Sequence, residues 1–500
     1  MNNLLIRADA TTEMGTGHIM RCLALAQGWQ AEGNQAIFLS HCESRALRRR
    51  VEATGVNFIS LDKVHPSPRD LQETLALVNQ LQAEWLVVDG YHFDPDYHHA
   101  VQKTGCRLLV IDDAAHLPEY HADILLNQNI NAEHLTHVCD RNTKMLLGAQ
   151  YTLLRAEFLA WRDRRREISR VARKLLVTLG GSDSDNVTLK VIQALQHTDI
   201  SGLETRIIVG SANPHLEMLN HTVQRSDGNF QLLTDVSDMP MQMAWADMAV
   251  TAGGTTCGEL AFMGVPSVLL VLAENQRANA EALGGNGAAM NLGGQGSVAP
   301  EQISRAVTQL ADSLGMRSAM ARRGQELVDG YGIERALMCL HGEKVWLRRV
   351  HEKDSRLIWE WANAPDTRAV SFSPEPISWE RHLQWFSLKL NDPDCFFSIA
   401  VNGEGVPIGQ VRYDVSGCEA TVSISIGANF RGRGYGRAIL MSASRQLYRV
   451  SRVKIIHAYI KMDNEISMRT FAKCGFRQTG TATVQGLPSA HLVLPKEATA

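Results

Sequence analysis

Short apolar runs alternate with segments of helical periodicity through the first third of the chain. The runs predict strands because they are almost wholly apolar, whereas the segments between them repeat apolar residues every three or four positions. The predicted strands are 4–8, 36–39, 85–89 and 107–111, and the predicted helices are 19–32, 43–53, 70–82 and 95–103. Apolar strands that alternate with helices are typical of a parallel sheet covered on both faces.

The same alternation returns in the middle third of the chain. It predicts strands at 174–179, 205–209, 230–233, 248–251 and 267–271, followed by helices over 303–327 and 333–345. We therefore expect a second parallel α/β sheet with its own core.

From Trp346 onward the pattern changes. Helical periodicity covers 354–363 and 378–390, and strands are predicted at 396–401, 407–413, 420–426 and 454–460. The turn signals Asn402-Gly403 and Ser416-Gly417 separate the first three of these strands, which favours antiparallel hairpins. The predicted domains are 1–165, 166–345 and 346–500, each long enough to bury a core.

Composition and charge narrow the function classes. The formal net charge is 50 − 53 = −3, which argues against a nucleic-acid partner. No run reaches the ~18 apolar residues of a membrane span, and the nine cysteines include no C-x-x-C pair. We expect a cytoplasmic protein with reduced thiols. His92, His98 and His99 lack the i, i+4 spacing of helical metal ligands, so no metal site is predicted.

A glycine-rich loop joins the first predicted strand to the first predicted helix. Gly15 and Gly17 let the backbone approach a ligand, and the free N–H groups of the helix start favour an anion. His18 stands at this helix start, where the helix dipole disfavours its positive charge and keeps it able to accept a proton. The alternative is a histidine with only a capping role. Arg21 follows one turn later.

Carboxylates end three of the predicted strands. Asp9, Asp89 and the pair Asp112-Asp113 occupy these positions, and Tyr91 lies in the loop after Asp89. Because ligands of open parallel sheets bind at the carboxyl ends of the strands, these side chains and His18 are expected to converge on one crevice. The alternative for each aspartate is a helix cap.

Two loops of the middle third have the composition of phosphate sites. Gly180, Gly181, Ser182 and Asp183 follow one predicted strand. The stretch TAGGTTCGE, residues 251–259, offers N–H groups and hydroxyls to a diphosphate and a carboxylate to a ribose. Polar groups also follow the strand 267–271. The predicted nucleotide-site residues of this half are Gly181, Ser182, Gly253, Gly254, Thr255, Thr256, Glu259, Asn275 and Gln276.

A third loop, Arg431 to Gly436, follows the predicted hairpins and opens an apolar helix starting near Arg437. Its successive N–H groups form an anion nest, and a pyrophosphate is the expected guest.

The motifs RADATTEMGTGHIMRCLALA, VVDGYHFD, VIDDAAH, DILLNQN, LGGSD and TAGGTTCGELAFMGVP together resemble the UDP-2,4-diacetamido-2,4,6-trideoxy-β-L-altropyranose hydrolases of pseudaminic acid biosynthesis. The resemblance covers about residues 1 to 340. It implies a GT-B-like pair of Rossmann-like domains, with His18 as catalytic base and residues 253–259 at UDP.

The chemistry implied by this resemblance is hydrolysis of UDP from the sugar with inversion at the anomeric carbon. His18 takes the proton of the attacking water, and Asp9 or Asp89 orients His18 or holds sugar hydroxyls. Gly15, Gly17, Arg21 and Tyr91 join the expected substrate site.

Residues 346–495 resemble the GNAT family of acetyl-CoA-dependent N-acetyltransferases through RGRGYG and NEISMRTFAKCGF. The resemblance implies a mixed α+β domain that holds acetyl-CoA. The cofactor-site residues expected are Ile426, Arg431, Gly432, Arg433, Gly434, Tyr435, Gly436, Asn464 and Phe471.

One position departs from the GNAT pattern. Many members have a tyrosine as general acid where this chain has Phe471, so Tyr459, water or an unassisted thiolate departure takes its place. Glu419 and His382 are candidates for the base.

Together the two resemblances imply a bifunctional enzyme. The GNAT domain acetylates the 4-amino group of a UDP-amino sugar, and the hydrolase then removes UDP. Two alternatives are a GT-B glycosyltransferase fused to a GNAT domain and a non-catalytic module that senses acetyl-CoA. Sugar stereochemistry, oligomeric state and channelling have no signature in the sequence.

Overall fold

The computed structural model describes residues 2–11, 14–162, 164, 166–181, 183–210, 213–234 and 236–496. The chain divides into two compact units, Met1–Ala336 and Leu337–Ala500. This division lies before the predicted boundary after residue 345. The further boundary predicted after residue 165 falls inside the first unit and stays a prediction.

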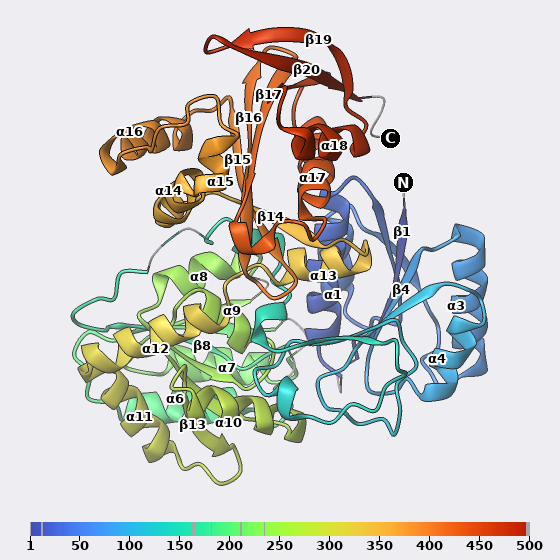
Figure 1. The fold of residues 1–500 in the computed structure, drawn as a ribbon. Helices are drawn as coiled ribbons and strands as arrows, with labels where there is room; N and C mark the ends of the chain where they lie inside the picture. The colour runs from blue at the N-terminus through green and yellow to red at the C-terminus, as the bar shows by residue number, and fades with distance from the viewer. Residues whose placement is uncertain are drawn as a thin grey trace. The chain divides into compact units, whose positions relative to one another are not determined.

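The first unit begins with a seven-stranded parallel sheet in the order β3-β2-β1-β4-β5-β6-β7 (Figure 1). Its strands are β1 Asn3–Ala8, β2 Gln35–Ser40, β3 Asn57–Ser60, β4 Trp85–Asp89, β5 Arg107–Ile111, β6 Ile124–Asn127 and β7 Lys144–Leu147. Its helices are α1 Gly17–Ala31, α2 Arg45–Glu52, α3 Pro68–Leu81, α4 Pro95–Gln102 and α5 Ala156–Leu159, with short 3-10 turns η1 Ala132–His134 and η2 Ala149–Tyr151. The central strands β1 and β4 are buried along almost their whole length.

The second half of this unit holds a six-stranded parallel sheet in the order β10-β9-β8-β11-β12-β13. The strands are β8 Lys174–Thr178, β9 Glu204–Val209, β10 Asn229–Thr234, β11 Met248–Ala252, β12 Ser267–Val271 and β13 Met290–Gly294. The helical elements are α6 Val187–Gln196, α7 Leu216–Gln224, α8 Met239–Trp245, α9 Thr256–Phe262, η3 Glu274–Gln276, α10 Arg277–Gly285, α11 Pro300–Asp312, α12 Leu314–Leu327 and α13 Gly332–Leu340.

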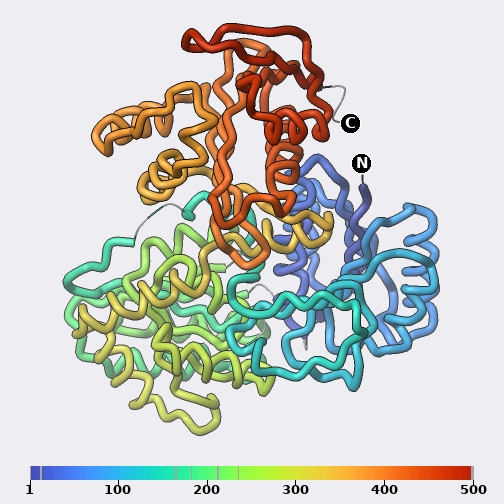
Figure 2. Tube along the Cα trace, viewed as in Figure 1, coloured from blue at the N-terminus to red at the C-terminus, as the bar shows by residue number. Residues whose placement is uncertain are grey.

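After the second sheet the chain returns to the first half of the unit (Figure 2). The start of α13 packs so closely on residues 151–152 that a Cβ on Gly332 would lie 2.2 Å from the Thr152 carbonyl oxygen. Arg335 donates a hydrogen bond to the Gln150 carbonyl oxygen at 2.7 Å. This segment therefore ties the two halves together.

The second unit is built on a mixed seven-stranded sheet in the order β14-β15-β16-β17-β18-β20-β19. Its strands are β14 Val345–Arg349, β15 Cys395–Asn402, β16 Pro407–Ser416, β17 Glu419–Ile426, β18 Ile455–Lys461, β19 Arg477–Val484 and β20 Leu487–Pro495. Its helical elements are η4 Glu352–Asp354, α14 Ser355–Asn363, α15 Pro365–Ala369, α16 Trp379–Leu390, η5 Ala428–Phe430, α17 Tyr435–Val450 and α18 Glu465–Lys473.

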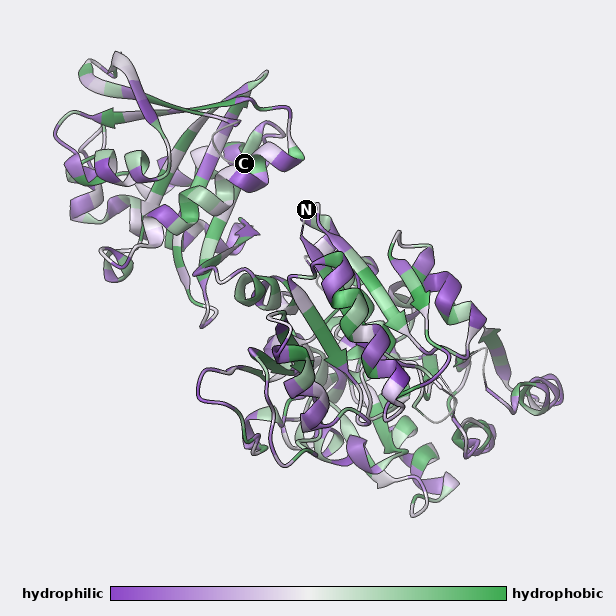
Figure 3. Cartoon of the chain, turned by 90° about the vertical axis from the view of Figure 1, so that its right-hand side faces the viewer, coloured by the Kyte–Doolittle hydropathy of each residue, from purple (hydrophilic) through white to green (hydrophobic). Residues whose placement is uncertain are grey.

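Each sheet carries its own core. In Figure 3 green, apolar segments are prominent on the strands of the first unit, whereas the strands of the second unit are more mixed in colour. The predicted fold class, two Rossmann-like α/β sheets followed by a mixed α+β domain, is confirmed. No described helix is both long and apolar enough to cross a lipid bilayer.

The predicted helix over 333–345 is wrong in its second half. α13 ends at Leu340, Gly342 adopts a φ of 63°, and Val345 begins β14. A glycine in the left-handed region readily ends a helix. Residues 345–349 then form β14 because they pair with β15.

The fully buried imidazole of His98 on α4 gives a pH prediction. Neither of its ring nitrogens has a hydrogen-bond partner, and burial, with a smaller contribution from His121, lowers its pKa to about 4. Between pH 6.5 and 4 the unfolded chain binds more protons at this histidine, so stability falls as the pH is lowered through that window. At pH 5 the loss from His98 alone is about 2 kcal/mol.

His98→Leu should therefore show a smaller loss of stability between pH 7 and pH 5 than the wild type, measured by urea unfolding. His221→Leu, a change of an exposed histidine on α7, is the matched control and should keep the wild-type difference. Equal losses in wild type and His98→Leu would contradict the assignment.

Candidate active sites

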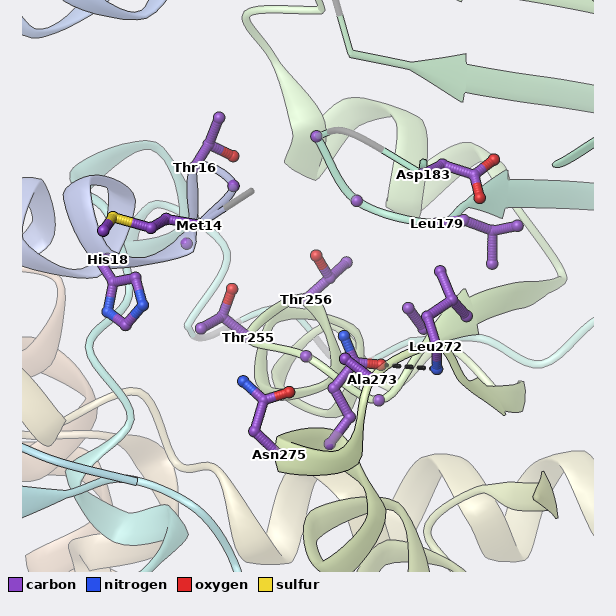
Figure 4. Close-up of a pocket in the computed structure, with 18 of the residues that line it drawn as sticks. Met14, Thr16, His18, Leu179, Asp183, Thr255, Thr256, Leu272, Ala273 and Asn275 are labelled. Carbon is purple, nitrogen blue, oxygen red and sulfur yellow. Dashed lines mark hydrogen bonds between the residues drawn. The ribbon is translucent and has the colours of Figure 1, made fainter. Parts of the chain in front are cut away.

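A cavity of about 300 Å³ in the first unit lies where strands of both sheets end (Figure 4). The loops after β1, β8, β11 and β12 form its walls, and Tyr91, Asp113 and Asn129 add side chains that follow β4, β5 and β6. Ligands of open parallel sheets bind at this edge.

Two helices begin at this cavity without a side-chain cap. α1 starts after Thr16 and α9 after Thr255, and neither has a side-chain hydrogen bond to its first turn. The two starts are close together, because a Cβ on Gly17 would lie 3.7 Å from Thr255 Oγ1. Uncapped N–H groups and two helix dipoles aimed at one space favour an anion with more than one phosphate.

The loop after β8 behaves differently. The Asp183 carboxylate accepts hydrogen bonds from the N–H groups of Val187 and Thr188 at 2.8 and 2.9 Å, so the start of α6 is already satisfied. Gly181 lines the cavity and packs close to Thr16, since a Cβ on it would lie 2.9 Å from Thr16 Oγ1. The predicted second phosphate loop thus lines the cavity, but the first N–H groups of its helix, α6, are already bonded to Asp183 and do not face a phosphate unpaired.

His18 lies at the cavity wall with its Nδ1 2.6 Å from Asp89 Oδ1. His18 Nδ1 also lies 3.1 Å from Arg21 Nη2, which only donates hydrogen bonds. The contact with the Asp89 carboxylate, which only accepts, is the shorter one, and it favours the neutral tautomer with its proton on Nδ1 and with Nε2 as the acceptor. Of the two aspartates expected to orient His18, Asp89 is the one in contact.

Arg21 fixes that carboxylate. Its Nε and Nη2 each lie 2.6 Å from an oxygen of Asp89, which is fully buried. Burial alone would raise the pKa of Asp89, but the charge of Arg21 and the contact with His18 outweigh it and hold the pKa below its ordinary value. Asp89 is therefore a fixed negative charge behind His18.

The same arginine begins a chain of contacts that crosses the cavity. Arg21 Nη1 lies 2.7 Å from Asp113 Oδ2, and Tyr91 donates its hydroxyl to Asp113 Oδ1. Asn275 of the second half donates to the Tyr91 hydroxyl oxygen at 3.0 Å. Burial and the neighbouring Asp113 raise the pKa of Tyr91, so its hydroxyl stays protonated.

Asp9 belongs to a separate group. It is held by Arg7, by the His41 N–H at 2.7 Å and by His92 Nε2 at 2.9 Å. Burial would raise its pKa, but these contacts lower it to about 2. Asp9 shares a smaller cavity of about 220 Å³ with His18 and Asp89 without touching His18.

The structure brings most of the predicted substrate residues together. Those that line the larger cavity are Gly15, Gly17, His18, Arg21, Tyr91, Gly181, Gly253, Gly254, Thr255, Thr256, Asn275 and Gln276. Glu259 is not part of this lining, and its Oε1 lies 2.9 Å from Arg155 Nη1. Ser182 lies outside the described residues.

Sequence reasoning missed several lining residues. Asp113 was visible as a strand-end carboxylate but was not chosen, and Asn129 belongs to the quoted motif DILLNQN. Met14 and Thr16 are neighbours of the chosen glycines and carry no separate signal. Among the described residues, no three His, Cys, Asp or Glu side chains are arranged to hold a metal ion.

The second unit has its own cavity of about 1010 Å³. The end of β17, the loop 431–436, α17 and α18 line it. Gly432 and Gly434 adopt φ values of 75° and 83°, which favour glycine, and α17 begins at Tyr435, two residues before the predicted start. The first turn of α17 has no side-chain cap, so its N–H groups are available to a pyrophosphate.

The two loop arginines differ in their contacts. Arg431 is tied to the Ile426 carbonyl oxygen, to Asp366 and to Thr367 at 3.1, 3.1 and 2.8 Å. Arg433 is exposed and is not part of the cavity lining. Four basic residues that sequence reasoning missed do line the cavity, namely Lys344, Arg437, Arg445 and Lys473.

The other predicted cofactor residues lie at this cavity. Ile426 and Asn464 line it, and Asn464 accepts a hydrogen bond from the Ser467 N–H at 3.1 Å as the cap of α18. Phe471 lines the cavity and packs in the core against Phe476.

The candidates for acid and base have other surroundings. Tyr459 and Glu419 do not line the cavity, and His382 is buried with its Nε2 2.8 Å from the Ser355 carbonyl oxygen. Burial lowers the pKa of His382. Its place among Trp379, Trp385 and Phe386 indicates a structural role.

Two family matches agree with these sites. Residues 175–329 match the glycosyltransferase family 28 C-terminal domain, and residues 344–477 match the acetyltransferase (GNAT) domain. The expected combination of a glycosyltransferase-type region and a GNAT acetyltransferase domain is confirmed at this level.

Three relatives extend the comparison. An uncharacterized protein of Methanocaldococcus jannaschii is 23% identical over 95% of this chain and 97% of its own length. The spore coat polysaccharide biosynthesis protein SpsG of Bacillus subtilis is 26% identical over 67% of this chain and 96% of its own. The UDP-2,4-diacetamido-2,4,6-trideoxy-β-L-altropyranose hydrolase of Campylobacter jejuni is 23% identical over 55% of this chain and 94% of its own.

The glycine loop gives a prediction for acetyl-CoA binding. Around Gly434 a Cβ would meet only Lys344 Nζ, at 3.9 Å, so a side chain there projects into open space at the cavity. Gly434→Val should lower acetyl-CoA affinity strongly, by blocking the approach to the N–H groups and straining a positive φ. Arg433→Ala should change the affinity little, because Arg433 lies outside the lining. Calorimetry with acetyl-CoA measures both.

Gly417→Val is the matched control, since Gly417 has a φ of 62°, nothing within 4 Å of its Cβ position and no place in the cavity. It should carry comparable backbone strain and bind acetyl-CoA like the wild type. A larger loss in Arg433→Ala than in Gly434→Val would show that side-chain charge dominates over the backbone nest.

Proposed function

We propose that the chain is a bifunctional nucleotide-sugar enzyme. Its first unit hydrolyses UDP from UDP-2,4-diacetamido-2,4,6-trideoxy-β-L-altropyranose, and its second unit acetylates the 4-amino group of the precursor sugar with acetyl-CoA. The observation that carries the hydrolase proposal is the His18–Asp89 pair, 2.6 Å apart, at a cavity where α1 and α9 begin without caps. The similarity to the Campylobacter jejuni hydrolase supports it.

In the proposed hydrolysis, His18 Nε2 takes a proton from water while the water oxygen bonds to the anomeric carbon. The bond from that carbon to the UDP oxygen breaks, and UDP leaves with the electron pair, so the configuration inverts. Asp89 stabilises the imidazolium that forms, and the first-turn N–H groups of α1 and α9 bind the diphosphate. Tyr91 and Asn275 offer hydroxyl and amide groups to the sugar.

In the proposed acetyl transfer, the second unit binds acetyl-CoA in the cavity beside α17. The first turn of α17 and the loop glycines hold the pyrophosphate, and Lys344, Arg437 and Lys473 supply positive charge around it. The match of residues 344–477 to the GNAT domain supports this assignment.

The two activities would act consecutively, because the acetylated sugar is the hydrolase substrate. The proposed domains are 1–165 and 166–345 for the hydrolase and 346–500 for the acetyltransferase. A test of the whole proposal is incubation of the full chain with UDP-4-amino-4,6-dideoxy-N-acetyl-β-L-altrosamine and acetyl-CoA, followed by NMR. The expected products are CoA, UDP and the free diacetamido sugar; an unchanged amino sugar would reject the acetyltransferase assignment.

A glycosyltransferase would need an acceptor other than water. Release of UDP from the diacetamido substrate with no acceptor present supports the hydrolase, and release only after an acceptor is added would support the transferase.

Replacing His18 tests the proposed base. His18→Asn should keep UDP affinity and lower kcat for hydrolysis by about 10²–10⁴, the usual range for a lost general base. UDP affinity comes from calorimetry and kcat from UDP release. His221→Asn, on the exposed α7 position, should behave as the wild type. Unchanged hydrolysis in His18→Asn would remove His18 from the mechanism.

A further inference from the structure

Two histidines of the second unit lie side by side on adjacent strands. His457 of β18 has its Nδ1 2.9 Å from Nε2 of His491 on β20, and the two rings are stacked within 14° of parallel. Both point away from the core, because the alternate residues Ile456, Ala458 and Leu492 are the ones buried in it.

Each histidine has a second partner that extends the row. Glu419 Oε2 of β17 lies 3.2 Å from His457 Nε2, and Thr479 Oγ1 of β19 lies 3.2 Å from His491 Nδ1. The register between β19 and β20 shifts between Gln478 and Gly480, so Thr479 is the extra residue of a bulge. A bulge re-aims a side chain, here toward His491.

The carboxylate fixes the direction of every hydrogen bond in this row. Glu419 only accepts, so neutral His457 carries its proton on Nε2 and accepts at Nδ1 from His491 Nε2–H. His491 then accepts at Nδ1, where Thr479 is the donor. At one end of the row, His491 Nδ1 can accept a proton. At the other end, Glu419 can pass a proton to water, because its side chain is 60% exposed.

The row stands where the sheet divides. β17 and β18 pair only from Glu419↔Ile455 to Thr421↔His457, and both strands continue beyond this point unpaired with each other. The acetyl-CoA cavity is lined by Ile424 to Ile426 at the end of β17 and by Asn464, the cap of α18. Its lining includes no residue of β18 and no member of the row. His457 thus occupies the last paired position before the two strands separate.

The geometry points to a proton relay, His491 to His457 to Glu419, that serves the acetyl transfer of the second unit. The inference rests on the proposed acetyltransferase function and adds the destination of the amine proton. Its ligand class is a primary amine presented on the polar face of the sheet at this opening.

The amine nitrogen forms a bond to the thioester carbonyl carbon, and the bond from that carbon to sulfur breaks with the electron pair on sulfur. The amine displaces the Thr479 hydroxyl, which turns to the His491 carbonyl oxygen 3.4 Å away. His491 Nδ1 then takes one N–H proton while its Nε2 proton passes to His457 Nδ1. The His457 Nε2 proton passes to Glu419 and from there to water, and the thiolate leaves as CoA.

The electrostatic surroundings suit a proton acceptor. Burial and the neighbouring His457 lower the pKa of His491, so it is neutral at pH 7. Tyr459 stacks on His491 with ring centroids 4.9 Å apart. The other titratable groups on this face, by strand alternation, are Arg348, Cys395, Arg412, Asp414, Lys461 and Arg477. Lys389 of α16 reaches the same face through its ion pair with Asp414 at 2.9 Å.

Kinetics of the full chain test the relay. His491→Gln and His457→Gln should lower kcat/KM for the amino sugar by about 10²–10⁴ and leave KM for acetyl-CoA unchanged. The wild-type rate should reach a plateau near neutral pH, whereas the rates of the two glutamine variants should keep rising with pH. Added imidazole should restore activity to His491→Gly. His351→Gln, outside the row and the cavity, is the control and should match the wild type.

The ¹⁵N spectra of histidine-labelled protein test the row without any acceptor substrate. The wild type should show His457 protonated on Nε2 alone, and Glu419→Gln should convert it to a mixture of tautomers. If the wild type does not acetylate the amino sugar, the proposed function is rejected. The spectra still show in that case whether Glu419 sets the tautomer of His457, as the hydrogen-bonded row requires. Wild-type pH profiles in both glutamine variants, or a His457 tautomer indifferent to Glu419→Gln, would overturn it.

Discussion

The candidate site of the first unit depends on the buried ion pair of Arg21 and Asp89. Asp89 is fully buried, and Arg21 meets both of its oxygens at 2.6 Å while also reaching Asp113. Removing two charges from water is costly, so such a pair persists only with good geometry and further hydrogen bonds. Here the further bonds go to His18 and, through Asp113, to Tyr91. Because the buried carboxylate needs these bonds, Asp89 is held in one position by Arg21, and its contact with Nδ1 holds the imidazole of His18 in one orientation.

The position of this pair follows from the sheet. β1 and β4 are neighbours in parallel register, with Ala8 opposite Asp89, so the end of β4 and the start of α1 come together at one edge. Arg21 and His18 are three residues apart on α1 and share one helix face. A helix packed on that strand pair thus presents both side chains to one carboxylate.

The sequence predicted the fold where its periodicity was strong. The central strands 85–89, 107–111 and 267–271 were found with the bounds that the structure has, because they are apolar throughout. The strands that were missed are β3, β6, β7, β13, β14, β19 and β20. Five of them, β3, β7, β13, β14 and β19, are edge strands, which carry weaker patterns and are set by pairing with their neighbours. β6 is buried but has only four residues.

The candidate sites divide in the same way. Glycine loops and His18 are visible from local motifs, whereas contacts between distant segments are not. The carboxylate partner of His18 is 71 residues away along the chain, and either of two strand-end aspartates fitted the sequence. The occupied start of α6 depends on a rotamer of Asp183, and the exclusion of Arg433 from its cavity depends on the path of one loop.

Both units place a histidine next to a carboxylate, but the carboxylate is buried in the first unit and mostly exposed in the second. Asp89 has no exposed surface and two oxygens held by Arg21, so a proton taken by His18 stays on the imidazole, stabilised by a charge that cannot itself leave or protonate near neutral pH. Glu419 is mostly exposed and has no such arginine among its contacts in the described residues. A proton arriving there meets water directly. The first arrangement suits a base that must hold a proton for one step, and the second suits a path that carries it away.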